Sequence, residues 1–190
     1  MKNNTKEPRA TKKPKNLEMH GDVRIDEYYW LNERENPEVI KHLENENNYT
    51  KKVLEHTEKF QQKLFEEMKG RIKKTDESVP YKHNGYWYYT RFEDNKEYPI
   101  YCRKKESLDS IEIILLDVNE LAQGLQYIDV TGLTVSNDNK ILAYGKDTLS
   151  RRIYTIHFKN LETGEMLPDS IENTSGSCCW ANDNMHVFFY

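Results

Sequence analysis

Cys102 and His83 have the side-chain types of a cysteine nucleophile and its general base. A catalytic cysteine needs a base within hydrogen-bond reach to form its thiolate. Cys102, however, lies in the middle of a predicted strand, YPIYCRKK, whereas His83 belongs to a predicted turn. We therefore interpret Cys102 as a structural thiol that is buried or half-buried.

A serine nucleophile would require a different pattern. The nucleophile elbow Gly-x-Ser-x-Gly presents its serine on a strained turn between a strand and a helix. The nearest string runs from Ser175 to Cys179 and reads SGSCC, so it lacks the second glycine. It also lies in a stretch that we predict to be entirely β. We expect no catalytic residue in this chain.

The sequence also lacks the patterns of a metal site or an acid–base site. Zinc sites use closely spaced ligands such as Cys-x₂-Cys or His-x₃-His, and neither spacing occurs among the six histidines and three cysteines. A turn explains His20-Gly21-Asp22 as well as a site would. The carboxylate pairs Glu66-Glu67 and Glu44/Glu46 lie on predicted exposed helix faces. We expect neither a metal nor a cofactor.

Arg151 and Arg152 are the remaining candidates. They lie in a predicted loop between two strands of a repeating sheet. Such loops can face a central cavity or a neighbouring domain. We therefore regard both arginines as candidate inter-domain or cavity contacts, where a guanidinium would form a salt bridge.

Composition and charge exclude several classes of protein. A net charge of −4 disfavours a general nucleic-acid binder, which should carry a basic face. No run approaches the ~18 apolar residues of a membrane span. Three cysteines, two of them adjacent, do not form a disulfide framework and indicate a reducing compartment, hence the cytoplasm. Apolar residues reach only 36%, so either part of the chain is disordered or its apolar faces need a partner.

The first third of the sequence predicts a tail and a helical arm. Residues 1–16 contain six Lys or Arg and two Pro but no large apolar side chain other than the initiating Met, which predicts a disordered basic tail. A phosphate-binding arm is the alternative. Residues 17–74 predict the helical arm: a short helix after Asp26, then a longer helix that Asn36 caps and Pro37 begins. A second helix carries one apolar stripe: Phe60, Leu64, Phe65, Met68 and Ile72.

After Thr75 the apolar period changes from about 3.6 to 2, which predicts strands. One short helix or turn is expected at 118–123. Tight turns separate the strands, so we predict a β-meander over 75–190. The expected strands are Tyr86–Phe92, Tyr98–Lys104, Ile111–Asp117, Leu133–Ser136, Ile141–Lys146, Ile153–Phe158, Ser177–Trp180 and Val187–Tyr190.

A weak internal repeat favours propeller blades. Asn137-Asp138-Asn139 and Asn182-Asp183-Asn184 each precede an apolar strand, 45 residues apart, and His83-Asn84-Gly85 does the same 54 residues earlier. Periods of about 40–50 residues with four strands each are typical of propeller blades. Because Tyr190 ends the second strand of its blade, we expect the propeller over 75–190 to be incomplete.

Long segments resemble a known family. The segments DEYYWLNERENPEV, YPIYCRKK and LTVSNDNKILAYGKDT resemble oligopeptidase B, a group of serine peptidases in the prolyl oligopeptidase family, and the likeness extends from Pro14 to Tyr190. It implies a helical segment packed on a C-terminal α/β-hydrolase domain and the first two to three blades of a seven-bladed propeller. It implies cleavage of short peptides after Lys or Arg, with the propeller limiting access. The hydrolase domain would be the docking surface of the apolar stripe.

The likeness also implies that the triad serine, aspartate and histidine lie outside these residues, so the chain alone should be inactive. The expected partners are short basic peptides and the hydrolase domain, with no nucleic acid and no membrane. The alternative is a stand-alone truncated propeller that serves as a protein-interaction module.

Overall fold

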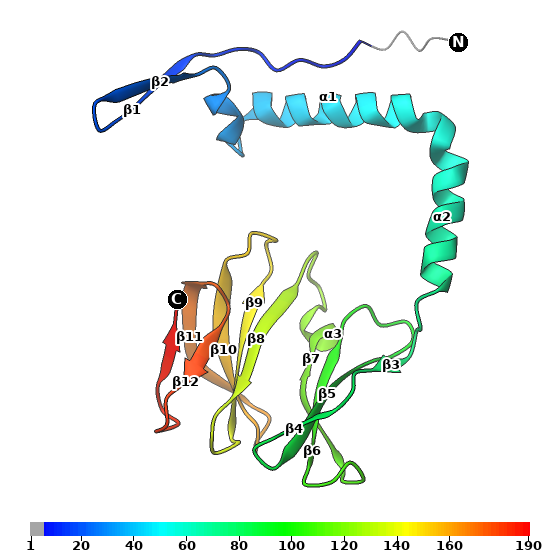
Figure 1. Ribbon diagram of the computed structural model, residues 1–190, viewed down its shortest axis with the longest axis vertical. Helices are drawn as coiled ribbons and strands as arrows, with labels where there is room; N and C mark the ends of the chain where they lie inside the picture. Colours follow the sequence, from blue (N-terminus) through cyan, green and yellow to red (C-terminus); the bar gives the residue numbers. More distant parts are fainter. Residues whose placement is uncertain (1–5) are drawn as a thin grey trace. The chain divides into compact units, whose positions relative to one another are not determined.

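A computed structural model describes residues 6–190, which fall into two compact units (Figure 1). The first unit ends at Ile72 and the second is Lys73–Tyr190. No helix in the described part of the chain is both long and apolar enough to cross a membrane.

The first unit begins with a β-hairpin. Strand β1 (Lys15–Met19) pairs with β2 (Asp22–Asp26), and the turn places His20 and Gly21 at φ 53° and 80°. Two successive residues in the left-handed region form the turn that matches the twist of a two-residue hairpin. The predicted turn is present, but strands flank it. We expected a disordered tail over 1–16, but Lys15 and Asn16 belong to strand β1. Residues 1–5 of that expected tail lie outside the described residues.

Residues around Trp30 connect the N-terminal segment that precedes the hairpin to the start of the helices. The 3₁₀ helix η1 (Tyr29–Asn32) follows Asp26, whose carboxylate accepts the Tyr28 N–H at 2.8 Å. The indole N–H of the buried Trp30 donates to the Thr11 carbonyl at 2.9 Å. This bond holds residues that we expected in a disordered tail.

Two helices make up the rest of this unit. Helix α1 (Pro37–Leu54) begins as predicted, because the Asn36 side chain accepts the Glu38 N–H at 2.9 Å. A 3₁₀ turn, η2 (Glu55–Thr57), leads into α2 (Glu58–Gly70). The apolar stripe of α2 is exposed, from 38% for Leu64 to 60% for Phe60 and Met68; Ile72, which we expected on the same helix, lies beyond its end and is 70% exposed. Within the described part of this unit, its apolar residues therefore have no core to join.

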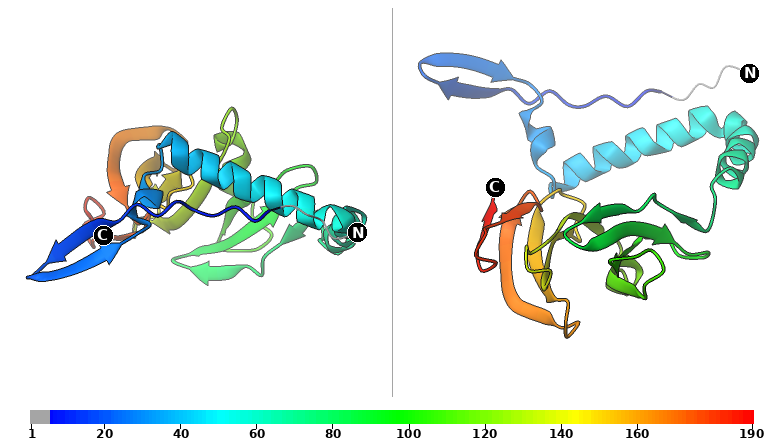
Figure 2. Two further views of the ribbon diagram at one scale, coloured as in Figure 1. Left: turned by 90° about the horizontal axis from the view of Figure 1, so that it is seen from above. Right: turned by 60° about the horizontal axis from the view of Figure 1, so that its bottom comes forward.

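The second unit consists of three antiparallel sheets that stand next to one another (Figures 1 and 2). In the first sheet, β3 and β4 both pair with β5, followed by β6 and β7; the second sheet is β8 to β11 in sequence order, and the third is β12 with β13. This is the arrangement of a partial β-propeller: two blades and the beginning of a third. The bounds are β3 Asp76–Glu77, β4 Tyr81–His83, β5 Tyr86–Phe92, β6 Ile100–Lys105, β7 Glu112–Asp117, α3 Val118–Leu121, β8 Asp129–Val135, β9 Ile141–Asp147, β10 Tyr154–Asn160, β11 Met166–Thr174, β12 Cys178–Trp180 and β13 Val187–Phe189.

All eight expected strands are present, but three others in the second unit were missed, as were β1 and β2 in the first unit. The longest is β11, with the sequence MLPDSIENT, which pairs only with β10. Its polar side chains and Pro168 argue against a central strand, whereas an edge strand tolerates a proline. The short β3 and β4 carry too few residues to show a period of 2.

The core lies between the blades. Leu142 and Tyr144 of β9 pack with Tyr88 and Leu116 of the first blade. Ala143, which points to the other face of β9, packs with β10 and with side chains of the third sheet. Because both faces of β9 are covered, its sequence is a continuous apolar run rather than an alternating one.

Glycines allow the third sheet to approach the second. A Cβ atom added at Gly132 or Gly145 would lie 2.1 or 2.4 Å from the Gly176 carbonyl oxygen. Gly176 itself has φ 90° and lies against the Tyr154 ring. Gly132 and Gly145 are required because no side-chain atom fits between their backbone and that of Gly176, and Gly176 because a side chain there would meet Thr131 and Tyr154.

The turns of the internal repeat meet at one end of the three sheets, which we call the turn end. The Asn84 amide donates to the Asn137 carbonyl at 2.6 Å, and the Asp138 N–H donates to Asn184 Oδ1 at 3.1 Å. The Asn137 amide reaches the Ala181 carbonyl at 3.5 Å. The predicted repeat thus corresponds to hydrogen bonds that link each blade to the next.

Candidate functional site

We call the opposite end of the sheets the loop end. Strands β5 and β9 both start at the turn end and run to the opposite end of their sheets. The β5–β6 and β9–β10 loops, which follow these strands, therefore lie at the loop end. Arg151 and Arg152 lie in the β9–β10 loop and are exposed. Their location in an inter-strand loop agrees with the sequence prediction; the contacts predicted for them remain untested.

Asp147 fixes the shape of this arginine loop. Its carboxylate accepts the backbone N–H groups of Leu149 at 2.7 Å and of Arg151 and Arg152 at 2.8 Å each. Burial raises the pKa of Asp147, but these backbone donors outweigh burial and hold the pKa below its usual value. Ser150 and Arg152 both have φ 56°, a conformation that these hydrogen bonds stabilise. The loop therefore presents two guanidinium groups from a fixed backbone.

A second aspartate lies opposite Asp147. Asp129 of β8 is its direct partner in the strand pair, so two carboxylates face each other across the ladder. Like charges in this position repel. The Tyr154 hydroxyl donates to Asp129 at 2.5 Å, and this bond, together with burial, raises the pKa of Tyr154 to about 12. Each carboxylate thus has its own set of donors.

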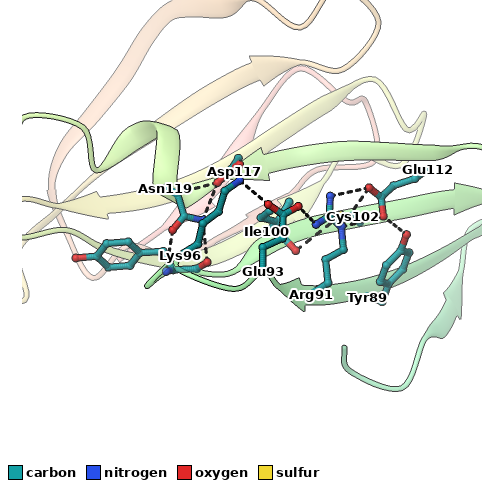
Figure 3. A network of polar contacts seen from close by, with 10 residues as sticks. Tyr89, Arg91, Glu93, Lys96, Ile100, Cys102, Glu112, Asp117 and Asn119 are labelled. Carbon is teal, nitrogen blue, oxygen red and sulfur yellow. Dashed lines mark hydrogen bonds and ion pairs between the residues drawn. The ribbon is translucent and has the colours of Figure 1, made fainter. Parts of the chain in front are cut away.

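A charged network lies on the face of the first blade that points away from the second (Figure 3). Arg91 donates from Nε to both Glu112 oxygens at 3.1 and 3.2 Å, and from Nη2 at 2.9 Å. Tyr89 also donates to Glu112, and Glu93 accepts from Arg91. The Arg91 hydrogen bonds lower the pKa of Glu112, while burial and the Glu112 contact raise that of Tyr89.

The network continues to the β5–β6 loop (Figure 3). Lys96 lies 2.8 Å from Glu93 and 3.3 Å from Asp117. Asp117 caps the short helix α3 by accepting the Asn119 N–H at 2.9 Å, and the Asn119 side chain bonds both backbone groups of Tyr98. Sequence reasoning missed these residues. The available signal was Arg91 and Glu112, each a charge on an otherwise apolar strand face.

The other sequence candidates have structural surroundings. Cys102 is buried beneath the network, and burial raises its pKa to about 12, so the thiol stays protonated. Its sulfur contacts the Ile100 carbonyl rather than a histidine. The serine-rich string contains Gly176, which forms the close contact between the second and third sheets. Among residues 6–190, no three His, Cys, Asp or Glu side chains come together to hold a metal ion.

The loop end therefore offers cationic groups that are suited to binding an anionic partner. Neither Arg151 nor Arg152 pairs with a carboxylate among the described residues, whereas Arg91 pairs with two. A guanidinium without a partner can bind a carboxylate in fork geometry.

Comparison with known proteins gives a consistent result. The family described as "Prolyl oligopeptidase, N-terminal beta-propeller domain" matches residues 8–190. Dipeptidyl aminopeptidase BI of Pseudoxanthomonas mexicana is 42% identical, with 97% of this chain and 27% of that protein covered. Protease 2 of Moraxella lacunata is 38% identical, with 96% and 27% covered. The chain thus spans about a quarter of the length of these curated relatives.

Solved structures agree. Oligopeptidase B from Leishmania major superposes with a TM-score of 0.85 at 27% identity, with 97% of this chain and 29% of that chain covered. The match supports the partial propeller that the repeat predicted.

Proposed function

We propose, from the premise that this chain belongs to the prolyl oligopeptidase N-terminal β-propeller family, that it forms the arm and first blades of an oligopeptidase B-like serine peptidase. The proposed reaction is hydrolysis of short peptides after Lys or Arg by a separate α/β-hydrolase domain. The propeller limits access to that domain, and the chain alone is inactive. The observation that carries the proposal is the family match over residues 8–190.

The exposed stripe of α2 supports a partner domain. Phe60, Phe65 and Met68 of α2 are each more than half exposed, and so is Ile72, which follows the end of the helix. Fully burying such a side chain contributes roughly 1.5–3 kcal/mol. We assign the hydrolase domain as the occupant of this face, because the relatives are almost four times as long as the chain and carry the peptidase names.

A substrate assay on the intact protein that carries this chain tests the reaction. We expect turnover of an N-terminally blocked chromogenic peptide ending in Arg-Arg, loss of turnover with a serine-directed inhibitor, and no turnover of the matched Ala-Ala peptide. We also expect a folded protein substrate to remain uncut. Equal rates on the Arg-Arg and Ala-Ala peptides would contradict the proposed specificity.

Removal of dipeptides from a free amino terminus is a second candidate. The relative named dipeptidyl aminopeptidase BI has a higher identity, 42%, than Protease 2, at 38%. The two reactions separate in the same assay, since a dipeptidyl aminopeptidase requires a free amine. Turnover of the unblocked peptide alone would favour this candidate.

We place Arg151 and Arg152 at the contact with the hydrolase domain, where each would pair with a carboxylate. Replacing both by alanine in the intact protein should lower kcat/KM by about two- to thirtyfold, since surface ion pairs contribute about 0.2–1 kcal/mol each. The decrease should shrink as salt is added. Lys105→Ala, at the turn end, is the matched control. Equal effects of the double and control variants would exclude this contact.

We also propose a cytoplasmic location. Cys102, Cys178 and Cys179 are all free thiols in the structure, which suits a reducing compartment. Cell fractionation tests this, and recovery with secreted proteins would contradict it.

A further inference from the structure

Arg103 lies between the first and second blades, on the face of β6 opposite Cys102. Its guanidinium group lies 4.0 Å from the centroid of the Tyr86 ring, and its Nη2 donates to the Asn139 carbonyl at 3.1 Å. The residue is only 4% exposed. It is therefore a buried cation in the interface between two blades.

Most of its hydrogen-bonding capacity is unused. A guanidinium has five N–H donors and stays protonated in proteins. The Nε and Nη1 atoms of Arg103 are buried and have no partner among the described residues. Tyr88 is the direct strand partner of Arg103, and its buried hydroxyl likewise has no hydrogen-bond partner among the described residues. Three polar atoms from two paired positions thus lack partners on one face of the sheet.

The charge of Arg103 is also uncompensated. Arg71 and Arg91 each pair with a carboxylate, but no described Asp or Glu oxygen lies within ion-pair distance of Arg103. Buried charges in proteins are paired, because transfer from water is costly. The Tyr86 ring and one carbonyl offset only part of that cost.

We propose that Arg103 is the centre of an enclosed binding site for one small monovalent anion of the size of chloride. The ligand is an anion because the guanidinium is positively charged. It is monovalent because the guanidinium carries a single charge. Arg103 and Tyr88 are only 4% and 7% exposed, which favours a small ligand over a large one. Nε, Nη1 and the Tyr88 hydroxyl are the proposed donors. The unpartnered Asn139 Oδ1 needs a donor of its own and would take a water molecule.

The test is the melting temperature of the intact protein as gluconate is replaced by chloride at constant ionic strength. Gluconate is too large for an enclosed site, and constant ionic strength removes changes in screening. A ligand that binds only the folded state should raise Tm by about 1 °C per tenfold rise in chloride above its dissociation constant, because the unfolding entropy of so long a protein is large. In bromide-grown crystals, an anomalous peak should appear beside Arg103.

Variants make the test specific. Arg103→Met should abolish the chloride dependence, whereas Arg71→Met, which alters an exposed arginine just after α2, should leave it unchanged. If Arg103→Met does not fold, Arg103→Lys and Tyr88→Phe should each raise the chloride concentration at half effect by severalfold.

A chloride dependence that is the same in the Arg103 and Tyr88 variants would overturn the proposal. So would a Tm that responds equally to chloride and gluconate. Bromide bound only at surface sites would likewise overturn it, as an adventitious ion only.

Discussion

Both units have clear apolar patterns in their sequences, but the apolar side chains are buried in the second unit and exposed in the first. In the second unit, Leu142 is 0% exposed because neighbouring sheets cover both faces of its strand. In the first unit, Phe60 is 60% exposed although its helix has a regular apolar stripe. Periodicity therefore identifies the face that needs cover, whereas only the packing shows whether the unit itself supplies that cover.

Two leucines offer the largest expected contrast. Leu142→Ala should destabilise the second unit by about 2–5 kcal/mol, because it leaves a cavity between two blades. Leu64→Ala, on the exposed face of α2, should change the stability of the first unit by less than about 0.5 kcal/mol when this chain is studied without the hydrolase domain. Denaturant unfolding with hydrogen exchange in each unit measures both. Similar losses would mean that the α2 face is already buried within the chain.

Two glycines test the same contrast at the backbone. Gly145→Ala should cost about 1–3 kcal/mol or more, because its Cβ would lie 2.4 Å from the Gly176 carbonyl oxygen. Gly70→Ala, in α2 with open space around it, should stabilise the helix by about 0.5–1 kcal/mol. Thermal unfolding shows whether each substitution raises or lowers the stability. A neutral Gly145→Ala would show that the third sheet moves away readily.

Two ion pairs extend the comparison to charge. Glu112→Gln, in the partly buried network, should cost about 1–2 kcal/mol, whereas Glu67→Gln, whose partner Arg71 is exposed, should cost at most about 0.5. The folded-state pKa of Glu112 is lowered, so its contribution is complete above the unfolded value near 4.3 and is lost as pH falls through the lower folded pKa. Stability measured from pH 6 to pH 3 should decline less in Glu112→Gln.

The smallest expected effect concerns His157. Burial, and then the charge of Lys146, lower the pKa of His157 in the folded state. A lowered histidine pKa means that stability is complete above the unfolded value near 6.5 and falls as the pH drops below it. We expect a loss of less than about 1 kcal/mol between pH 7 and pH 5, absent in His157→Gln. A loss that persists in this variant would assign the dependence to another group.

The sequence by itself determined the local elements. Asn36-Pro37 began a helix, alternation from Tyr86 to Phe92 gave a strand with those bounds, and the Asn-rich turns marked the blades. Capping, φ preference and side-chain period are properties of neighbouring residues, so a single sequence contains them. The arginine loop was located in the same way, from the strands on either side of it.

Tertiary structure decided the rest. It made a strand of β11, buried Arg103 between two blades, and joined Arg91 to Glu112 across a gap of 21 residues. It also set Gly145 against Gly176. These contacts depend on which strands become neighbours, and a residue's own sequence window holds no information about a partner that folding brings to it from elsewhere in the chain.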